Sequence, residues 1–163
     1  MKKIGLLSDT HGYLHPRVSV FFKDCDEIWH AGDIGNIETL DKLSTIAPVR
    51  AVYGNIDGGT LRHELNEYEF FTIDGLSVLI IHIGGYPGRY DSYARQLISD
   101  LKPGLFISGH SHILKVIPDK KRELLHINPG AAGKIGLHQV ITMVKLVIES
   151  GKVKDLEIFE SKR

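Results

Sequence analysis

The first two thirds of the chain alternate short apolar runs with segments whose apolar residues recur every three to four positions. The apolar runs at 3–8, 26–31 and 49–54 have the length of buried strands. The segments between them, 14–25 and 37–47, each carry one apolar face and predict helices, with Pro16 in the first turn of the first helix. Alternating strands and helices predict an α/β fold with parallel strands.

The remainder of the chain is richer in strands. Asp74-Gly75, between β-rich runs at 69–73 and 76–83, predicts a hairpin, and a third helix follows at 93–101. After a strand at 105–108 the helical pattern stops, and we predict a meander of strands at 114–118, 123–128, 138–150 and 152–160. Because a sheet with so many strands tends to split, we expect two facing sheets with helices outside, in one domain over residues 1–163.

Composition argues against several functional classes. Twenty basic residues balance twenty acidic ones, so no net charge favours nucleic acid or an anionic membrane. Cys25 is the single cysteine, which argues against a disulfide framework. The apolar run before Ser8 is shorter than the roughly 7–15 residues of a signal-peptide core, and no segment approaches the roughly 20 apolar residues of a membrane span. We expect a cytoplasmic protein without a membrane partner.

Polar groups follow five of the predicted strands. They are Asp9 and His11, Asp33, Asn55 and Asp57, His82, and His110 and His112. Ligands of open α/β sheets bind beyond the carboxyl ends of the strands, and parallel strands would bring these five ends to one rim. Glycines at 32, 54 and 109 each precede one of the candidates and allow a close approach of the backbone. A single histidine in such a place is usually a surface residue, so only the joint pattern favours a site.

The donor types point to a metal centre. Two aspartates, one asparagine and four histidines, with no thiolate, suit Mn, Fe, Co, Ni or Zn better than Ca or Mg. Seven ligands are too many for one tetrahedral ion but fit two ions that share a bridging carboxylate. Two ions roughly 3.5–4 Å apart can bind a hydroxide between them and clamp a phosphoryl group for in-line attack.

The ordered motifs "DTH", "GD", "GN", a lone histidine after a strand, and "GHSH" resemble those of the calcineurin-like metallophosphoesterases. The resemblance is greatest to the small YfcE- and MJ0936-type phosphodiesterases, which share the short chain and the closing "NPG" at 128–130. It implies a four-layer α/β/β/α sandwich of two facing mixed sheets flanked by helices. It also implies a metal-dependent phosphodiesterase that uses a metal-bridging hydroxide and forms no covalent enzyme intermediate.

The resemblance also implies roles for individual residues. Carried over by motif, the first metal ion would be held by Asp9, His11 and His112, the second by Asn55, His82 and His110, and Asp33 would bridge the two. Asp33, Asn55 and His82 are the implied catalytic residues. The implied cofactors are two divalent ions, Mn first, with Ni, Fe, Co or Zn as alternatives. The implied partners are a small phosphodiester and, since relatives associate, a second copy in a dimer or tetramer.

One departure from the family concerns the leaving group. Larger relatives have a histidine that protonates it at the position of Ile56. Isoleucine cannot donate a proton, so we expect Asp57, His30 or water to serve and the rate to depend steeply on the leaving-group pKa. For the glycine-rich loop after His82 two alternatives stay open: Arg89 or Tyr90 contacts the phosphate or its ester group, or the loop is solvated.

Five histidines lie outside the implied ligand set. We expect His30 to be an outer partner of a metal ligand and His126 to line the rim. We predict no role for His15, His63 and His138.

Two other functions remain open. A Vps29-like protein would share the fold and act as a scaffold through protein contacts, with an altered metal site. A phosphomonoesterase would act on nucleotides or sugar phosphates. All seven positions hold competent ligands, which favours an enzyme over a scaffold.

Overall fold

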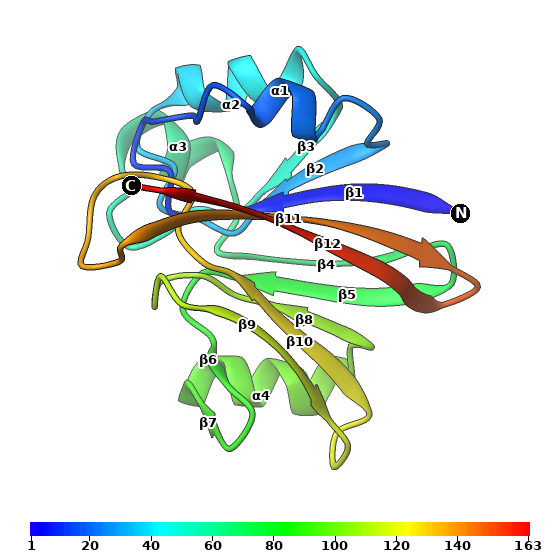
Figure 1. The fold of residues 1–163 in the computed structure, drawn as a ribbon. Coiled ribbons are helices and arrows are strands. Elements are labelled where there is room, and N and C mark those ends of the chain that lie inside the picture. Colours follow the sequence, from blue (N-terminus) through cyan, green and yellow to red (C-terminus); the bar gives the residue numbers. More distant parts are fainter.

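Two five-stranded mixed sheets lie face to face in the computed structural model, which describes residues 1–163 (Figure 1). The first sheet has the order β12 (Lys152–Lys162), β11 (Val140–Glu149), β1 (Lys2–Leu7), β2 (Glu27–His30), β3 (Val49–Ala51). The second has the order β4 (Tyr68–Ile73), β5 (Leu76–Ile81), β8 (Leu105–Ile107), β10 (Leu124–Pro129), β9 (Leu114–Asp119).

Helices cover the outer faces of both sheets. The helices α1 (Val18–Phe21) and α2 (Ile37–Ser44) lie on the first sheet, and α4 (Ser92–Leu101) lies on the second (Figure 1). A short helix, α3 (Gly59–Glu64), follows β3, and a small hairpin of β6 (Gly85–Tyr86) and β7 (Arg89–Tyr90) precedes α4. The predicted four-layer α/β/β/α fold is therefore confirmed. None of the four helices is long and apolar enough to cross a membrane.

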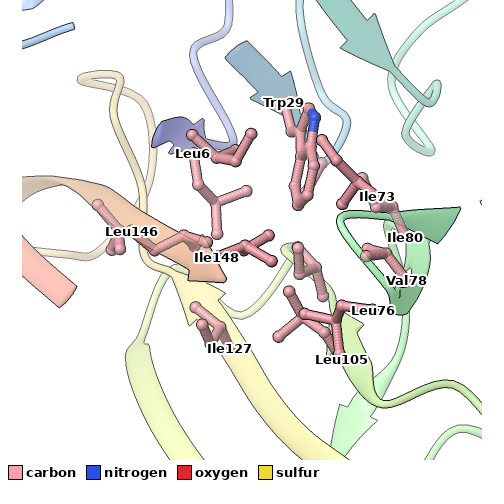
Figure 2. Close-up of a cluster of buried hydrophobic side chains, with 14 of the residues drawn as sticks. Leu6, Trp29, Ile73, Leu76, Val78, Ile80, Leu105, Ile127, Leu146 and Ile148 are labelled. Carbon is pink, nitrogen blue, oxygen red and sulfur yellow. The ribbon is translucent and has the colours of Figure 1, made fainter. Parts of the chain in front are cut away.

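Strand periodicity explains the layers. Along β1, Ile4 and Leu6 join the core between the sheets, whereas Leu7 joins the cluster under α1 and α2. In β8, Leu105 and Ile107 face the same central core and Phe106 packs beneath α4. Side chains alternate between faces because successive Cβ atoms of a strand point to opposite sides. Figure 2 shows the central core, in which Trp29 of β2 meets aliphatic side chains from both sheets.

Three strands of each sheet run parallel, and this arrangement creates the rim. In the first sheet β1, β2 and β3 are parallel, and in the second β5, β8 and β10 are parallel. Their carboxyl ends gather at one end of the sandwich, on the left in Figure 1. The Asp74-Gly75 hairpin between β4 and β5 forms as predicted.

Several expectations about local structure were wrong. The helix predicted over 14–25 is a single turn at 18–21, with Pro16 before it and turns on both sides. This one turn is enough to place Val18 and Phe22 in the same buried cluster. The strand expected to reach Gly54 ends at Ala51. The last four strands do not form one meander: β9 and β10 pair in the second sheet, and the chain then crosses so that β11 and β12 extend the first. Neither α3 nor the β6–β7 hairpin was predicted.

Candidate metal centre

The seven candidate ligands lie together at the rim, on the loops that follow β1, β2, β3, β5 and β8. Six of them form two groups, each of whose ligand atoms lie within 4.8 Å of one another. The groups are Asp9, His11 and His112, and Asp33, His82 and His110. Each group has the donor types and the size to hold one metal ion.

The two groups are in contact through Asp33. Its Oδ2 lies 3.2 Å from Nε2 of His82 and 3.7 Å from Nε2 of His11, which belongs to the other group. Nε2 of His82 lies in turn 3.9 Å from Oδ1 of Asp9. Asn55, the seventh candidate, has Oδ1 3.1 Å from Nδ1 of His110. A single carboxylate thus lies between two clusters of donors.

Two ligand atoms are buried without a hydrogen-bond partner, Nε2 of His11 and Nε2 of His82. Nδ1 of His82 donates to the carbonyl oxygen of Ala31 at 2.7 Å, because a carbonyl can only accept. In the neutral ring Nε2 then carries a bare lone pair, directed toward Asp33 and Asp9. Buried polar atoms are normally paired, and a cation between these groups would satisfy the lone pair. The residues therefore fit divalent metal ions.

The carboxylates are held in their charged form. Burial acts to raise the pKa of Asp9, but the hydrogen bond with His112 and the charge of His82 hold that pKa below its usual value. Burial likewise opposes the shift at Asp33, where the adjacent His82 lowers the pKa. Asp33 raises the pKa of His82 in return, against its burial. The two carboxylates thus carry negative charge beside the imidazoles, and a bound cation would compensate that charge.

The backbone of the site is strained. Nine residues other than glycine have positive φ, and five of them are candidate ligands: Asp9, His11, Asp33, His110 and His112. This left-handed conformation costs on the order of 1 kcal/mol or more for a residue with a Cβ and clusters at functional sites. Its concentration in the candidate set is a structural sign of function beside the donor chemistry.

Gly32, Gly54 and Gly109 each precede one candidate ligand and pack against a candidate ligand from another loop. A Cβ at Gly54, before Asn55, would collide with the carboxylate of Asp33. One at Gly109, before His110, would lie 2.9 Å from Oδ2 of Asp9. One at Gly32 would lie 2.7 Å from Nδ1 of His82. The loops therefore interlock, and glycine is required where one loop passes beside another.

Asp57 and His30 support the loops rather than face solvent. The Asp57 carboxylate, 3% exposed, accepts backbone N–H bonds from Ile34, Gly35 and Gly54 at 3.0, 2.9 and 2.8 Å. His30 is fully buried between Thr10 and Gly32, with its Nδ1 accepting from Gly32 N at 3.1 Å and its Nε2 2.9 Å from Thr10 Oγ1. The expectation that either protonates a leaving group was wrong, because neither side chain reaches the open rim.

Two expectations for the rim also fail. His126 is fully buried beneath the outer layer, stacked on Phe106, and does not line the rim. The hydroxyl of Tyr90 donates to Asp119 at 2.8 Å and is not free for a phosphate. Arg89 is exposed and lines a cavity of about 250 Å³ beside His110.

That cavity and a second one border the candidate ligands. The first is also lined by Tyr86, Lys115 and Asn128. The second, of about 340 Å³, is lined by Asn55, His82, Tyr53 and Tyr93 among others. Both cavities leave open space next to candidate ligands, His82 in one and His110 in the other.

Two supporting residues were missed in the sequence. Asn128, of the "NPG" motif, is buried and donates to the carbonyl of Gly109 at 2.9 Å, which fixes the loop that carries His110. His138 lies with Nδ1 3.2 Å from Nδ1 of His112. The motif was a usable signal for Asn128, whereas nothing in the local sequence singles out His138.

Comparison with known proteins identifies relatives along most of the chain. Residues 1–151 match the calcineurin-like phosphoesterase superfamily domain. A probable metallophosphoesterase of Methanothermobacter thermautotrophicus is 31% identical over 166 residues, which cover 97% of this chain and 92% of that protein. The phosphodiesterase MJ0936 of Methanocaldococcus jannaschii is 26% identical over 144 residues, 78% of this chain and 82% of that protein.

Solved structures share the fold. An archaeal phosphodiesterase superposes with a TM-score of 0.75 at 23% identity, with 96% of this chain and 99% of that chain covered. Vps29 of Entamoeba histolytica, complexed with Zn²⁺, superposes with a TM-score of 0.73 at 21% identity and 98% coverage of both chains. At these identities the structural similarity establishes the fold alone.

Proposed function

This chain belongs to the calcineurin-like phosphoesterase superfamily, and from that premise we propose that it is a dinuclear metal-dependent phosphodiesterase. The observation that carries the proposal is the position of Asp33, whose Oδ2 lies between the unpartnered Nε2 atoms of His82 and His11. A phosphodiesterase among the sequence relatives supports a diester as the substrate.

In this proposal Asp9, His11 and His112 would hold one ion, Asn55, His82 and His110 would hold the other, and Asp33 would serve both. Bound ions would lower the pKa of a water molecule toward 7 and neutralise charge on the phosphoryl group. The shared carboxylate of Asp33 fixes the spacing of the two groups. Its Oδ1 accepts the backbone N–H of Ile56 at 3.1 Å, which holds the side chain in place.

The rim residues determine what happens to the leaving group. Ile56 is 49% exposed at the mouth of the centre and offers no proton, and Asp57 and His30 are buried. None of these three residues therefore supplies an acid beside the phosphoryl position, and in this proposal the departing alkoxide takes its proton from water. We assign Arg89, with Lys115 in the same cavity, to the ester group or a non-bridging oxygen of the substrate.

Manganese is our first choice of metal, since carboxylate and amide oxygens suit it, and the imidazole ligands make Ni, Fe, Co or Zn the alternatives. A cytoplasmic location and a dimer or tetramer complete the proposal.

The observation behind the scaffold alternative is the fold that this chain shares with Vps29. It predicts no hydrolysis with any metal. The monoesterase alternative predicts faster turnover of a monoester than of a diester.

The test is hydrolysis of bis(p-nitrophenyl) phosphate and p-nitrophenyl phosphate by metal-stripped protein supplied with Mn²⁺, Ni²⁺, Co²⁺ or Zn²⁺. We expect turnover of the diester that a chelator abolishes and added metal restores. Asp33→Asn is the matched variant, with an expected loss of at least about a hundredfold. The control is Asp155→Asn, an exposed carboxylate on β12, which leaves the rate unchanged. No turnover with any of the metals would contradict the enzyme.

A further inference from the structure

His138 lies on the loop that carries the chain from β10 in the second sheet to β11 in the first. Its two ring nitrogens have different partners. Nε2 lies 2.7 Å from the carbonyl oxygen of Gly133, and Nδ1 lies 3.2 Å from Nδ1 of His112. The rings of the two histidines meet edge to face, 4.9 Å apart.

These contacts determine where the protons lie. The Gly133 carbonyl can only accept, so Nε2 of His138 carries a hydrogen. In neutral His138 the other nitrogen, Nδ1, is then a lone-pair acceptor. The hydrogen bond to it must come from Nδ1–H of His112. Nε2 of His112 lies 3.2 Å from Oδ1 of Asp9. Without metal it can donate to that carboxylate, and with metal bound it is the nitrogen left to hold the cation.

The loop is built to keep this arrangement. Gly133, which anchors His138 through its carbonyl, donates its own N–H to the backbone carbonyl of Asp9 at 3.0 Å. A Cβ at Gly136 would collide with the ring of His112 and lie 3.0 Å from Nδ1 of His138. Arg163 holds the far side of the loop through hydrogen bonds to Gly136 and Gln139. One loop thus joins His138 to both Asp9 and His112.

We propose that His138 is a positioning residue that fixes His112 in the tautomer able to bind the first metal ion through Nε2. The inference rests on the proposed metal centre and extends it to a residue outside the seven ligands. Outer partners of metal-bound histidines are usually carboxylates, carbonyls or water, as with Ala31 and His82. In this chain the outer partner of His112 is a second histidine, His138, and it serves a ligand of the first ion only.

The role predicts an asymmetric effect on metal binding. In His138→Phe no acceptor faces His112, and we expect affinity for one ion to fall by about 10–100-fold, with affinity for the other within twofold. His138→Gln offers an amide oxygen to the same N–H and should recover most of the loss. His63→Phe, an exposed histidine of α3, is the matched control and should change neither affinity.

The experiment is a calorimetric titration of metal-stripped protein with Mn²⁺, together with long-range ¹H–¹⁵N spectra of the wild type loaded with diamagnetic Zn²⁺. The spectra report the tautomers directly and need no variant to fold. We expect Nδ1–H at His112 and Nε2–H at His138. Equal weakening of both ions, no weakening in His138→Phe, or an Nε2–H tautomer at His112 would overturn the inference. None of these readouts uses turnover, so a protein that binds metal without hydrolysing esters would refute the proposed function and leave this inference standing.

Discussion

Oδ2 of Asp33 lies 3.2 Å from Nε2 of His82, although the two residues follow strands of opposite sheets. The contact joins the carboxyl ends of β2 and β5 across the sandwich. Metal ions bound here would connect the two sheets. Metal binding should therefore be coupled to the stability of the whole fold, because the site exists only when both sheets are packed.

The first prediction follows from this coupling. Mn²⁺ at a free concentration 100 times its dissociation constant should raise the free energy of unfolding by about 2.7 kcal/mol for each ion bound. Asp33→Asn should lose most of this gain, because both groups of donors contact its carboxylate. Urea unfolding with and without metal measures the effect. A gain that is the same in wild type and in Asp33→Asn would place the stabilising ions elsewhere.

A second prediction concerns the leaving group. Because Ile56 offers no proton and neither Asp57 nor His30 reaches the rim, hydrolysis of alkyl diesters should be far slower than that of aryl diesters. Ile56→His places an imidazole on an exposed position beside Asp33 and should raise the rate on alkyl diesters by about 10²-fold, with little change on aryl ones. The measurement is kcat/KM over a series of phenol and alcohol leaving groups. Ile56→Gln is the control for side-chain polarity, and a flat series for the wild type would refute the prediction.

A third prediction tests the strain at His110. This residue has φ +69° and an exposed side chain. Without metal, His110→Gly should be more stable than His110→Ala by about 1 kcal/mol, because only glycine adopts this backbone without cost. At Ser99, an exposed position inside α4, the order should reverse, with alanine the more stable. Thermal unfolding of the four metal-free variants measures both differences. If alanine were the more stable residue at both positions, His110 would be unstrained.

A fourth prediction concerns acid. Burial lowers the pKa of His126 to about 4, with the nearby Lys115 acting in the same direction and the hydrogen bond to Phe106 O opposing both. The unfolded histidine titrates near 6.5. Between those values the unfolded chain binds a proton that the folded chain does not, so stability should fall as the pH falls from about 6.5 to 4.

The size of this effect can be isolated with one substitution. The His126 share amounts to about 3 kcal/mol over the full window at about 1.4 kcal/mol per pH unit. His126→Phe keeps the ring stacked on Phe106 and removes the titrating group. We expect a shallower dependence of the unfolding free energy on pH between 6.5 and 4 for metal-free His126→Phe. His30, whose burial also lowers its pKa to about 4, remains in both proteins. Equal slopes for wild type and variant would contradict the assignment.

The sequence was informative about the candidate site where potential metal ligands directly follow a predicted strand. Each candidate ligand follows an apolar run, so parallel strands suffice to predict that the residues meet. Trp29, within the apolar run at 26–31, is fully buried in the core. The layered fold follows from the same periodicity of strands and helices.

Residues that depend on the path of loops were not predictable in this way. His138 is separated from His112 by 26 positions, and only the crossing from β10 to β11 brings it to the site. Asp57 looked like an acid at a strand end, but three backbone donors surround it. Val18 and Phe22 showed helical spacing, although a single turn is enough to bury both.

The number of metal ions per chain tests the central claim most directly. Metal-stripped wild type, His11→Ala and Asn55→Ala should each be equilibrated with excess Mn²⁺, freed of unbound metal and analysed for metal and protein content. We predict two ions for the wild type and one for each variant, with each variant losing a different ion. A single ion in the wild type, or two ions retained in both variants, would contradict a dinuclear centre that these residues share.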